Sequence, residues 1–158
     1  MSKRRSDARS ERSTLRLDSV TFFTDRGLGY HDVPDALRKA GLLVEAQQDH
    51  FNSDCDDPTW LAEVGRRGWV ILTKDKSFRS RQNEVAALMR ANTAAFFLTS
   101  SGTTGPQNAA TFIKAIPQMF GLIASVSKPF LAQITPAGSV SIVLTHQMMM
   151  DLHGRLSQ

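Results

Sequence analysis

Trp69-Val70-Ile71-Leu72-Thr73-Lys74-Asp75 is the clearest strand signal in this sequence. Four apolar residues in a row, two of them β-branched, follow a Gly-Arg-Arg-Gly break, which is typical of a strand buried on both faces of a parallel sheet. The run closes on the carboxylate of Asp75. Because ligands of open α/β sheets bind beyond the carboxyl ends of the strands, Asp75 is a candidate site residue.

Strand and helix patterns alternate along most of the chain. β-branched and aromatic runs predict further strands at residues 20–24, 42–46 and 93–99, and the first of these also closes on an acid, Asp25. Apolar spacing with start and stop signals predicts helices at 32–41, 58–65, 84–90 and 106–125. This order predicts an α/β fold with a mainly parallel sheet and helices on both faces. We expect Pro117 to kink or divide the long helix.

The last part of the chain has a different pattern. Two strand-like runs, 129–134 and 139–144, flank the turn signal Thr135-Pro136-Ala137-Gly138 and predict a C-terminal β-hairpin, as a sheet edge or a dimer contact. Residues 145–158 fit a tail or a short helix. We therefore expect one folded domain over 18–144, preceded by an arm over 1–17.

Size and composition indicate an ordinary globular domain. A chain of 158 residues can bury a sufficient core without disulfides, and the single cysteine, Cys55, excludes an internal one. No apolar run is long enough to cross a bilayer, and the basic N-terminus has no apolar region after it. These features lead us to expect a cytoplasmic protein with no membrane partner.

The basic charge is concentrated at the N-terminus. Residues 1–16 contain six Lys or Arg and two acids, whereas the remainder has equal numbers of basic and acidic side chains. Such an arm buries too little apolar surface to order itself. It is either a solvated tail or a segment that attracts nucleic acid phosphates.

Three acids are placed where a shared site can form. Asp25 and Asp75 follow strands that can be neighbours, and Asp57 is predicted to cap the helix that begins at Pro58. That capping role is also a sufficient structural reason for Asp57. If the polar loop 47–57 returns Asp57 to the same sheet edge, the carboxylates repel one another unless a divalent cation such as Mg²⁺ or Mn²⁺ joins them.

Basic side chains flank these acids in the sequence. They are Arg26, Lys74, Lys76, Arg79 and Arg81. They either neutralise a phosphodiester backbone or form an ordinary solvated surface.

The motifs as a set resemble a known family. Phe-Phe-Thr-Asp25, Val-Pro-x-Ala-Leu-Arg-x-Ala-Gly41, Asp57-x-x-Trp-Leu and Gly-Trp-Val-Ile-Leu-Thr-Lys-Asp75 are similar to the PIN-like nucleases of VapC-type toxins, over roughly residues 19–143. The resemblance implies a three-layer α/β/α fold, a Mg²⁺ or Mn²⁺ site and endoribonuclease activity restrained by an antitoxin. By position it implies Asp25, Asp57 and Asp75 as catalytic metal ligands.

A fourth acid, common in this family, has no equally clear candidate. Glu84 is the best, followed by Asp56, although a Glu at a helix start is equally explained by the helix dipole. The leading hypothesis is thus a metal-dependent ribonuclease, the toxin of a type II toxin–antitoxin pair, acting on RNA and able to form a homodimer. The alternatives are a degenerate PIN-like module that binds nucleic acid or protein without cutting, and a phosphoacceptor domain resembling a response regulator.

Overall fold

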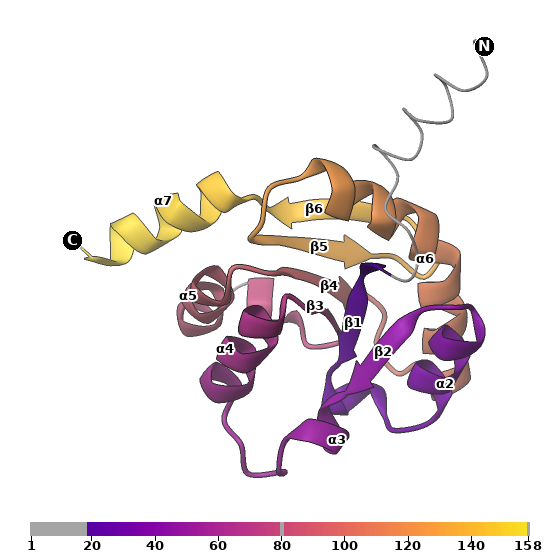
Figure 1. Cartoon of the computed structure of the whole chain (residues 1–158). Helices are drawn as coiled ribbons and strands as arrows, with labels where there is room; N and C mark the ends of the chain where they lie inside the picture. Colours follow the sequence, from indigo (N-terminus) through magenta and orange to yellow (C-terminus); the bar gives the residue numbers. More distant parts are fainter. Residues whose placement is uncertain (1–18, 80, 158) are drawn as a thin grey trace, which may run out of the picture.

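A computed structural model describes residues 19–79 and 81–157, which form a six-stranded sheet in the order β2-β1-β3-β4-β5-β6. The strands are β1 (Thr21–Thr24), β2 (Leu43–Ala46), β3 (Val70–Thr73), β4 (Ala94–Leu98), β5 (Phe130–Ile134) and β6 (Val140–Leu144). Neighbouring strands are parallel except β5 and β6, which are antiparallel. The predicted mainly parallel sheet with a C-terminal hairpin is confirmed (Figure 1).

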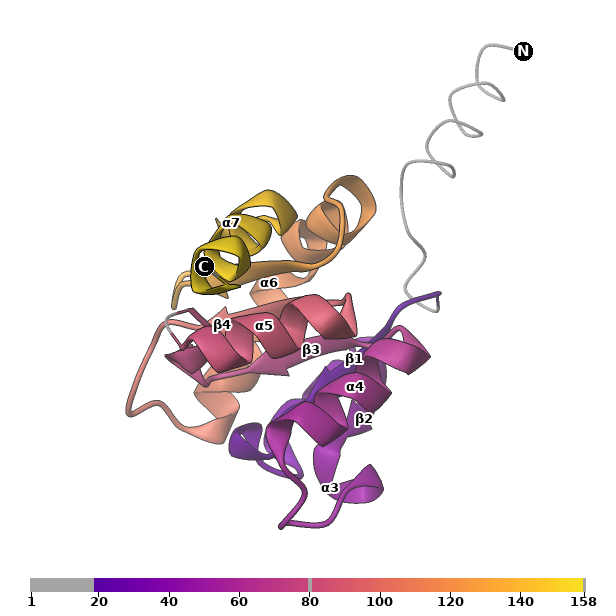
Figure 2. The ribbon, with the colours of Figure 1, turned by 90° about the vertical axis from the view of Figure 1, so that its left-hand side faces the viewer.

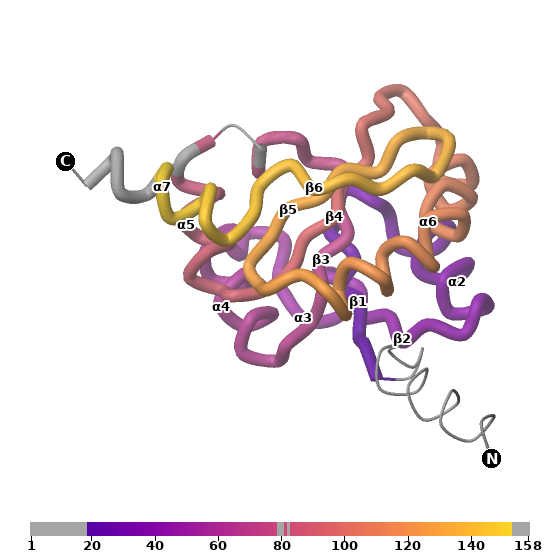
Figure 3. The backbone as a smooth tube through the Cα atoms, turned by 90° about the horizontal axis from the view of Figure 1, so that it is seen from above, coloured from indigo at the N-terminus to yellow at the C-terminus, as the bar shows by residue number. Residues whose placement is uncertain are grey.

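Helices cover both faces of this sheet. They are α2 (Asp32–Lys39), α3 (Gln47–His50), α4 (Asp57–Arg67), α5 (Gln82–Ala91), α6 (Gly105–Ser125) and α7 (His146–Ser157), with 3-10 helices η2 (Arg26–Leu28) and η3 (Lys76–Arg79). Viewed from above, α2 and α6 lie on one side of the sheet and α4, α5 and α7 on the other (Figure 3). The fold is therefore a three-layer α/β/α arrangement.

Alternation along the strands divides the core into two parts. Phe22 packs with the α2 and α6 layer, whereas the next residue, Phe23, packs with α4 and α5. In β3, Leu72 likewise packs with the α2 and α6 layer, and Ile71 packs with α4 and α5. Because successive strand residues point to opposite faces, a continuous apolar run is needed wherever both faces are covered.

One local expectation was wrong, and one of the two outcomes expected at Pro117 is excluded. Residues 47–57 were expected to be a loop, but Gln47–His50 form the short helix α3. Pro117 does not divide the long helix, because α6 is continuous from Gly105 to Ser125. Pro117 removes one helical hydrogen bond, to the carbonyl of Ile113. Both residues are on the exposed side of α6, where water can hydrogen-bond that carbonyl instead.

The C-terminal segment forms a helix. α7 runs from His146 to Ser157 and packs on the α5 side of the sheet (Figure 2), with Met149 buried in that part of the core. The expected arm over 1–17 lies outside the described residues. Among the residues that the structure describes, no helix has the length and apolar character needed to cross a membrane.

Candidate active site

Asp25 and Asp75 lie beyond the carboxyl ends of neighbouring strands. β1 and β3 are paired in parallel, with Thr24 opposite Leu72. The backbone N–H of Asp25 continues this ladder by donating to the carbonyl of Leu72 at 3.0 Å. The sequence-based expectation that these two strand ends are adjacent is therefore met.

Thr73 connects these two acids and was not identified from the sequence. Its side chain is fully buried. Its hydroxyl donates to Oδ2 of Asp25 at 2.5 Å and accepts the backbone N–H of Asp75 at 3.0 Å. A hydroxyl at the end of an otherwise apolar strand, two residues before an acid, was the available signal. Its hydrogen bond to Asp25 depends on strand pairing, which the local sequence does not specify.

Both carboxylates are further oriented by local hydrogen bonds. Oδ1 of Asp75 accepts from the backbone N–H of Ser77 at 2.9 Å and from the Ser77 hydroxyl at 2.6 Å. Oδ1 of Asp25 accepts from the backbone N–H of Gly27 at 3.2 Å. Oδ2 of Asp75 has no hydrogen-bond partner among the described residues, so it is available to a ligand.

Asp57 is not the helix cap that the sequence predicted. Asp56 occupies that position, with its Oδ1 accepting the backbone N–H of Thr59 at 2.9 Å. Asp57 is the first helical residue and Pro58 the second, where the missing N–H of proline still costs no helical hydrogen bond. Because Asp56 supplies the cap, Asp57 is left with one hydrogen bond, from the Trp60 indole to its Oδ1 at 2.8 Å.

The pKa of Asp25 is raised above its ordinary value, mainly because burial disfavours the ionised form. Hydrogen bonds from Thr73 and Gly27 lower this pKa, and the charges of Asp75 and Asp57 raise it. Asp25 is therefore within reach of the charges of both other predicted acids. Desolvation combined with like charges at a sheet edge is characteristic of functional carboxylates.

Glu84 lies in the first turn of α5. Its Oε2 is buried and has no hydrogen-bond partner among the described residues. A buried carboxylate oxygen without a donor is unfavourable unless it is protonated or binds a cation. This observation keeps Glu84 as a candidate ligand.

The predicted basic residues differ in their surroundings. The guanidinium of Arg26 donates to the carbonyl of Phe51 at 2.9 Å, so it holds the chain after α3. A methyl group at Gly27 would lie 3.6 Å from Cε of Lys74, which places the Lys74 side chain beside the Asp25 loop. Lys76 and Arg81 are exposed, and the side chain of Arg79 lies outside the described part of the chain.

Comparison with protein families identifies the fold and gives it a name. The family model described as "PIN like domain" matches residues 20–100. The chain belongs to the PIN-like domain family. The matched residues extend from β1 to the end of β4 and contain all the candidate acids. The hairpin β5–β6 and α7 follow this part of the PIN-like domain.

One curated relative agrees with this assignment. The chain is 25% identical over 133 residues to "Putative ribonuclease VapC45" of Mycobacterium tuberculosis. The alignment covers 82% of this chain and 96% of the relative. A search of solved structures found no match.

The acids of this PIN-like domain are not gathered into a closed metal cage. Among residues 19–79 and 81–157, no group of three or more His, Cys, Asp or Glu side chains is close enough to hold an ion. Mg²⁺ does not require such a cage, because it is usually bound by one or two carboxylates and several waters. The unpaired Oδ2 of Asp75 and the buried Oε2 of Glu84 are hard oxygen donors of the appropriate kind.

Proposed function

We propose that this chain is a divalent-metal-dependent endoribonuclease and the toxin of a type II toxin–antitoxin pair. The observation that carries the proposal is that two carboxylates from separate segments follow neighbouring strand ends at one edge of the sheet. Asp25 and Asp75 end neighbouring strands, and Asp57 acts on Asp25 through its charge. Membership of the PIN-like family and the ribonuclease name of the curated relative support the same activity.

In this proposal Asp25, Asp57 and Asp75 hold Mg²⁺ or Mn²⁺, and Glu84 is a weaker candidate for a fourth ligand. When bound, such an ion supplies positive charge to a phosphate and makes an attacking water more acidic. Thr73 keeps Oδ2 of Asp25 in a fixed orientation through its hydrogen bond. Ser77 does the same for Oδ1 of Asp75, which leaves the second oxygen of that carboxylate free.

The basic side chains near the acids would bind the RNA backbone. We assign this role to Lys74, which lies beside the Asp25 loop, and to the exposed Lys76 and Arg81. Arg79 stays in the set as a prediction from the sequence. Arg26 is given a different role, because its guanidinium is bonded to the Phe51 carbonyl and positions the loop instead.

Two partners are part of the proposal. A toxic ribonuclease requires an inhibitor in its own cell, so we expect a cognate antitoxin that covers the acidic edge. A homodimer also remains a prediction. We place its contact at the C-terminal hairpin, where β6, like β2 at the opposite edge, has no strand partner on one side in the described sheet.

The direct test compares Asp75→Asn with the unaltered chain on single-stranded RNA. Asp75→Asn should fold normally and lose Mn²⁺-dependent cleavage, because it removes one ligand charge at the strand end. Asp54→Asn is the matched control, since Asp54 is an exposed acid of the loop before α4. Equal cleavage by Asp75→Asn and Asp54→Asn in nuclease-free preparations would defeat the proposal.

A second candidate function is a PIN-like module that binds RNA or protein without cutting. It is favoured by one observation, that no three acidic or other metal-binding side chains of the described chain are gathered tightly. This module would bind RNA equally well with and without Mg²⁺ or Mn²⁺. It would leave that RNA intact at every metal concentration, whereas the nuclease would cleave it once the metal is added.

A further inference from the structure

A groove of about 490 Å³ lies between the end of α3 and the outer face of α4. His50 and Phe51 form one wall, and Thr59, Ala62 and Arg67 are on the other. This volume is within the range of sites that bind small molecules or single nucleotides. The groove is lined by the ring of Phe51, by Arg66 and Arg67, and by the carboxylate of Glu63, which pairs with both arginines. An aromatic ring beside basic side chains is a combination by which proteins bind single-stranded nucleic acids.

The groove begins beside the candidate active site. Thr59 lies two residues after Asp57, in the first turn of α4. The backbone of Phe51 is tied to the loop that carries Asp25. Its carbonyl accepts a hydrogen bond from the guanidinium of Arg26, the residue after Asp25. From Thr59 to Arg67 the helix rises about 12 Å. A strand with its scissile phosphate at the acids can therefore continue along α4.

The aromatic wall is fixed by its neighbours. The ring of Phe51 contacts Phe23 edge to face, with centroids 6.0 Å apart. The His50 ring lies 5.1 Å from the Trp69 ring, and its Nε2 is 2.7 Å from the Glu45 carboxylate. These contacts limit the motion of both rings, so little conformational entropy is lost when a base stacks on Phe51.

The guanidinium of Arg67 is fixed in place while its two terminal nitrogens remain free to donate. Its Nε donates to Glu63 at 2.8 Å, and its guanidinium lies 4.9 Å from the centre of the Trp69 ring. Its two terminal nitrogens have no hydrogen-bond partner among the described residues, and 41% of the side chain is exposed. A guanidinium held at one nitrogen and on one face, with two donors free, is suited to a phosphate.

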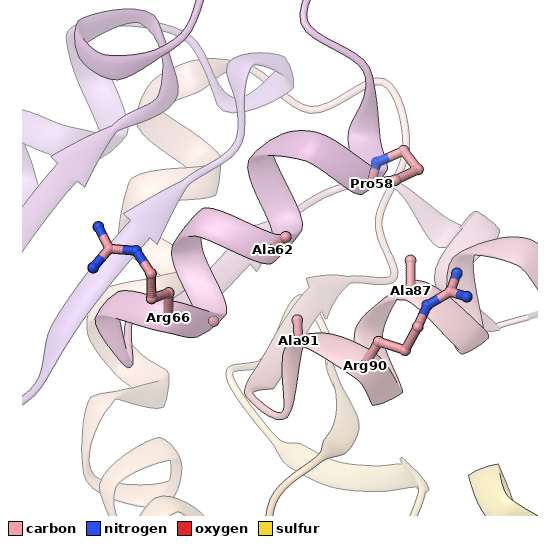
Figure 4. A pocket seen from close by; sticks show the side chains of 7 residues that line it. Pro58, Ala62, Arg66, Ala87, Arg90 and Ala91 are labelled. Carbon is pink, nitrogen blue, oxygen red and sulfur yellow. The ribbon is translucent and has the colours of Figure 1, made fainter.

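A second hollow of about 400 Å³, between α4 and α5, does not have this arrangement. Its floor consists of small residues, including Ala62, Ala87 and Ala91. Arg66 and Arg90 are at its rim but extend away from each other (Figure 4). Because Arg66 extends from α4 away from α5, it also lines the groove that contains Arg67, where it is paired with Glu63.

We propose that this groove is a subsite for single-stranded RNA, in which a base flanking the cleaved bond stacks on Phe51 and a phosphate is bound by Arg67. The proposal rests on the ribonuclease function and deepens it, because it assigns the direction of the strand from the acids along α4. Stacking on a ring and binding to phosphate carry no base code, so the subsite recognises single strands with little sequence preference.

The test measures binding of a fluorescent single-stranded RNA of mixed sequence to the full chain carrying Asp75→Asn, which is expected not to cleave. Adding Arg67→Gln should weaken binding about fivefold at low salt and reduce the salt slope by about 0.7, because one phosphate contact is lost. Adding Phe51→Leu should weaken binding about fivefold without changing the salt slope. Phe51→Tyr keeps the ring and should bind within about twofold of the parent.

The controls separate this subsite from a general change of charge or fold. Lys114→Gln removes one positive charge from α6, on the opposite face of the sheet, and should leave RNA binding unchanged. Parent-like binding by both Arg67→Gln and Phe51→Leu would overturn the subsite while Mn²⁺-dependent cleavage by the unaltered chain still stood. Loss of binding in Phe51→Tyr equal to that in Phe51→Leu would also overturn it. Weaker binding in a chain that never cleaves would retain the subsite and reject the nuclease.

Discussion

The two ends of α4 carry opposite charges. Asp56 and Asp57 are at its start, and Arg66 and Arg67 are at its end. The helix dipole alone favours both placements, since anions are stabilised near an N-terminus and cations near a C-terminus. Charge at a helix end is therefore not evidence of a site.

Within each end of α4, the charged side chains differ in how many of their hydrogen-bonding atoms already have a partner. Asp56 accepts the backbone N–H of Thr59, whereas the carboxylate of Asp57 receives only the Trp60 indole. At the other end Glu63 binds both arginines but leaves the terminal nitrogens of Arg67 free. Functional groups at a helix end are recognised by unused hydrogen-bonding capacity, and both ends of α4 have some.

The largest effect is expected on RNA cleavage, and it should distinguish Asp57 from its neighbour Asp56. Asp57→Asn should reduce Mn²⁺-dependent RNA cleavage about 100-fold, with little change in thermal stability, because the amide oxygen can still accept from Trp60. Asp56→Ala should keep cleavage within a few-fold but lose about 1 kcal/mol of stability with the helix cap. Cleavage rates and urea unfolding of the two variants provide the comparison.

The opposite pattern would break the distinction between these acids. If Asp56→Ala lost cleavage and Asp57→Asn retained it, Asp56 would be the functional acid. Asp54→Asn serves as the control for loss of one charge in the same loop.

The next largest effect concerns the packing that holds α4 in place. A methyl group at Gly65 would collide with the backbone of Ala91 at the end of α5. Gly65→Ala should therefore lose about 1–3 kcal/mol of unfolding free energy, since two helix backbones would have to separate. Gly121→Ala is the control, because a methyl group there contacts nothing within 4 Å. Equal stability of the two variants in urea unfolding would contradict the close approach of α4 and α5.

These residues also show what the sequence could and could not predict. Apolar runs located β1 and β3, and the strand–helix alternation placed Asp25 and Asp75 at one edge, because parallel strands end together. The cap was misassigned between Asp56 and Asp57, since the choice depends on where the backbone turns into the helix. Thr73 was missed because its hydrogen bond to Asp25 joins residues 48 positions apart.

Burial of the Asp25 carboxylate makes the stability of the folded chain depend on pH. The pKa of this carboxylate is raised in the folded chain, mainly by burial, so ionisation opposes folding once the pH exceeds the unfolded value of 3.8. In metal-free protein at pH 7.5, Asp25→Asn should therefore melt above the unaltered chain. The difference should disappear below the unfolded pKa, and a lower Tm for Asp25→Asn that does not depend on pH would contradict it.

The smallest effect is expected at the basic end of α4. Hydrogen bonds from Arg66 and Arg67 lower the pKa of Glu63 to about 2. The stability that this pairing contributes is therefore present above the ordinary pKa of 4.5 and is lost as the pH falls towards 2. The Glu63 side chain is 31% exposed and both arginines are at the surface, so Glu63→Gln should lower the Tm only slightly at pH 7, and not at all near pH 2 or in high salt. A difference that persists near pH 2 would show that Glu63 stabilises the fold by other means.

The central claim is that carboxylates from separate segments share one divalent ion, and calorimetric titration of the metal-free chain with Mn²⁺ tests it most directly. Mn²⁺ should bind saturably to the unaltered chain and to Asp54→Asn. Binding should be at least about tenfold weaker in Asp25→Asn and in Asp75→Asn. Unchanged Mn²⁺ affinity in the triple variant Asp25→Asn, Asp57→Asn, Asp75→Asn, or no binding by the unaltered chain, would contradict that claim.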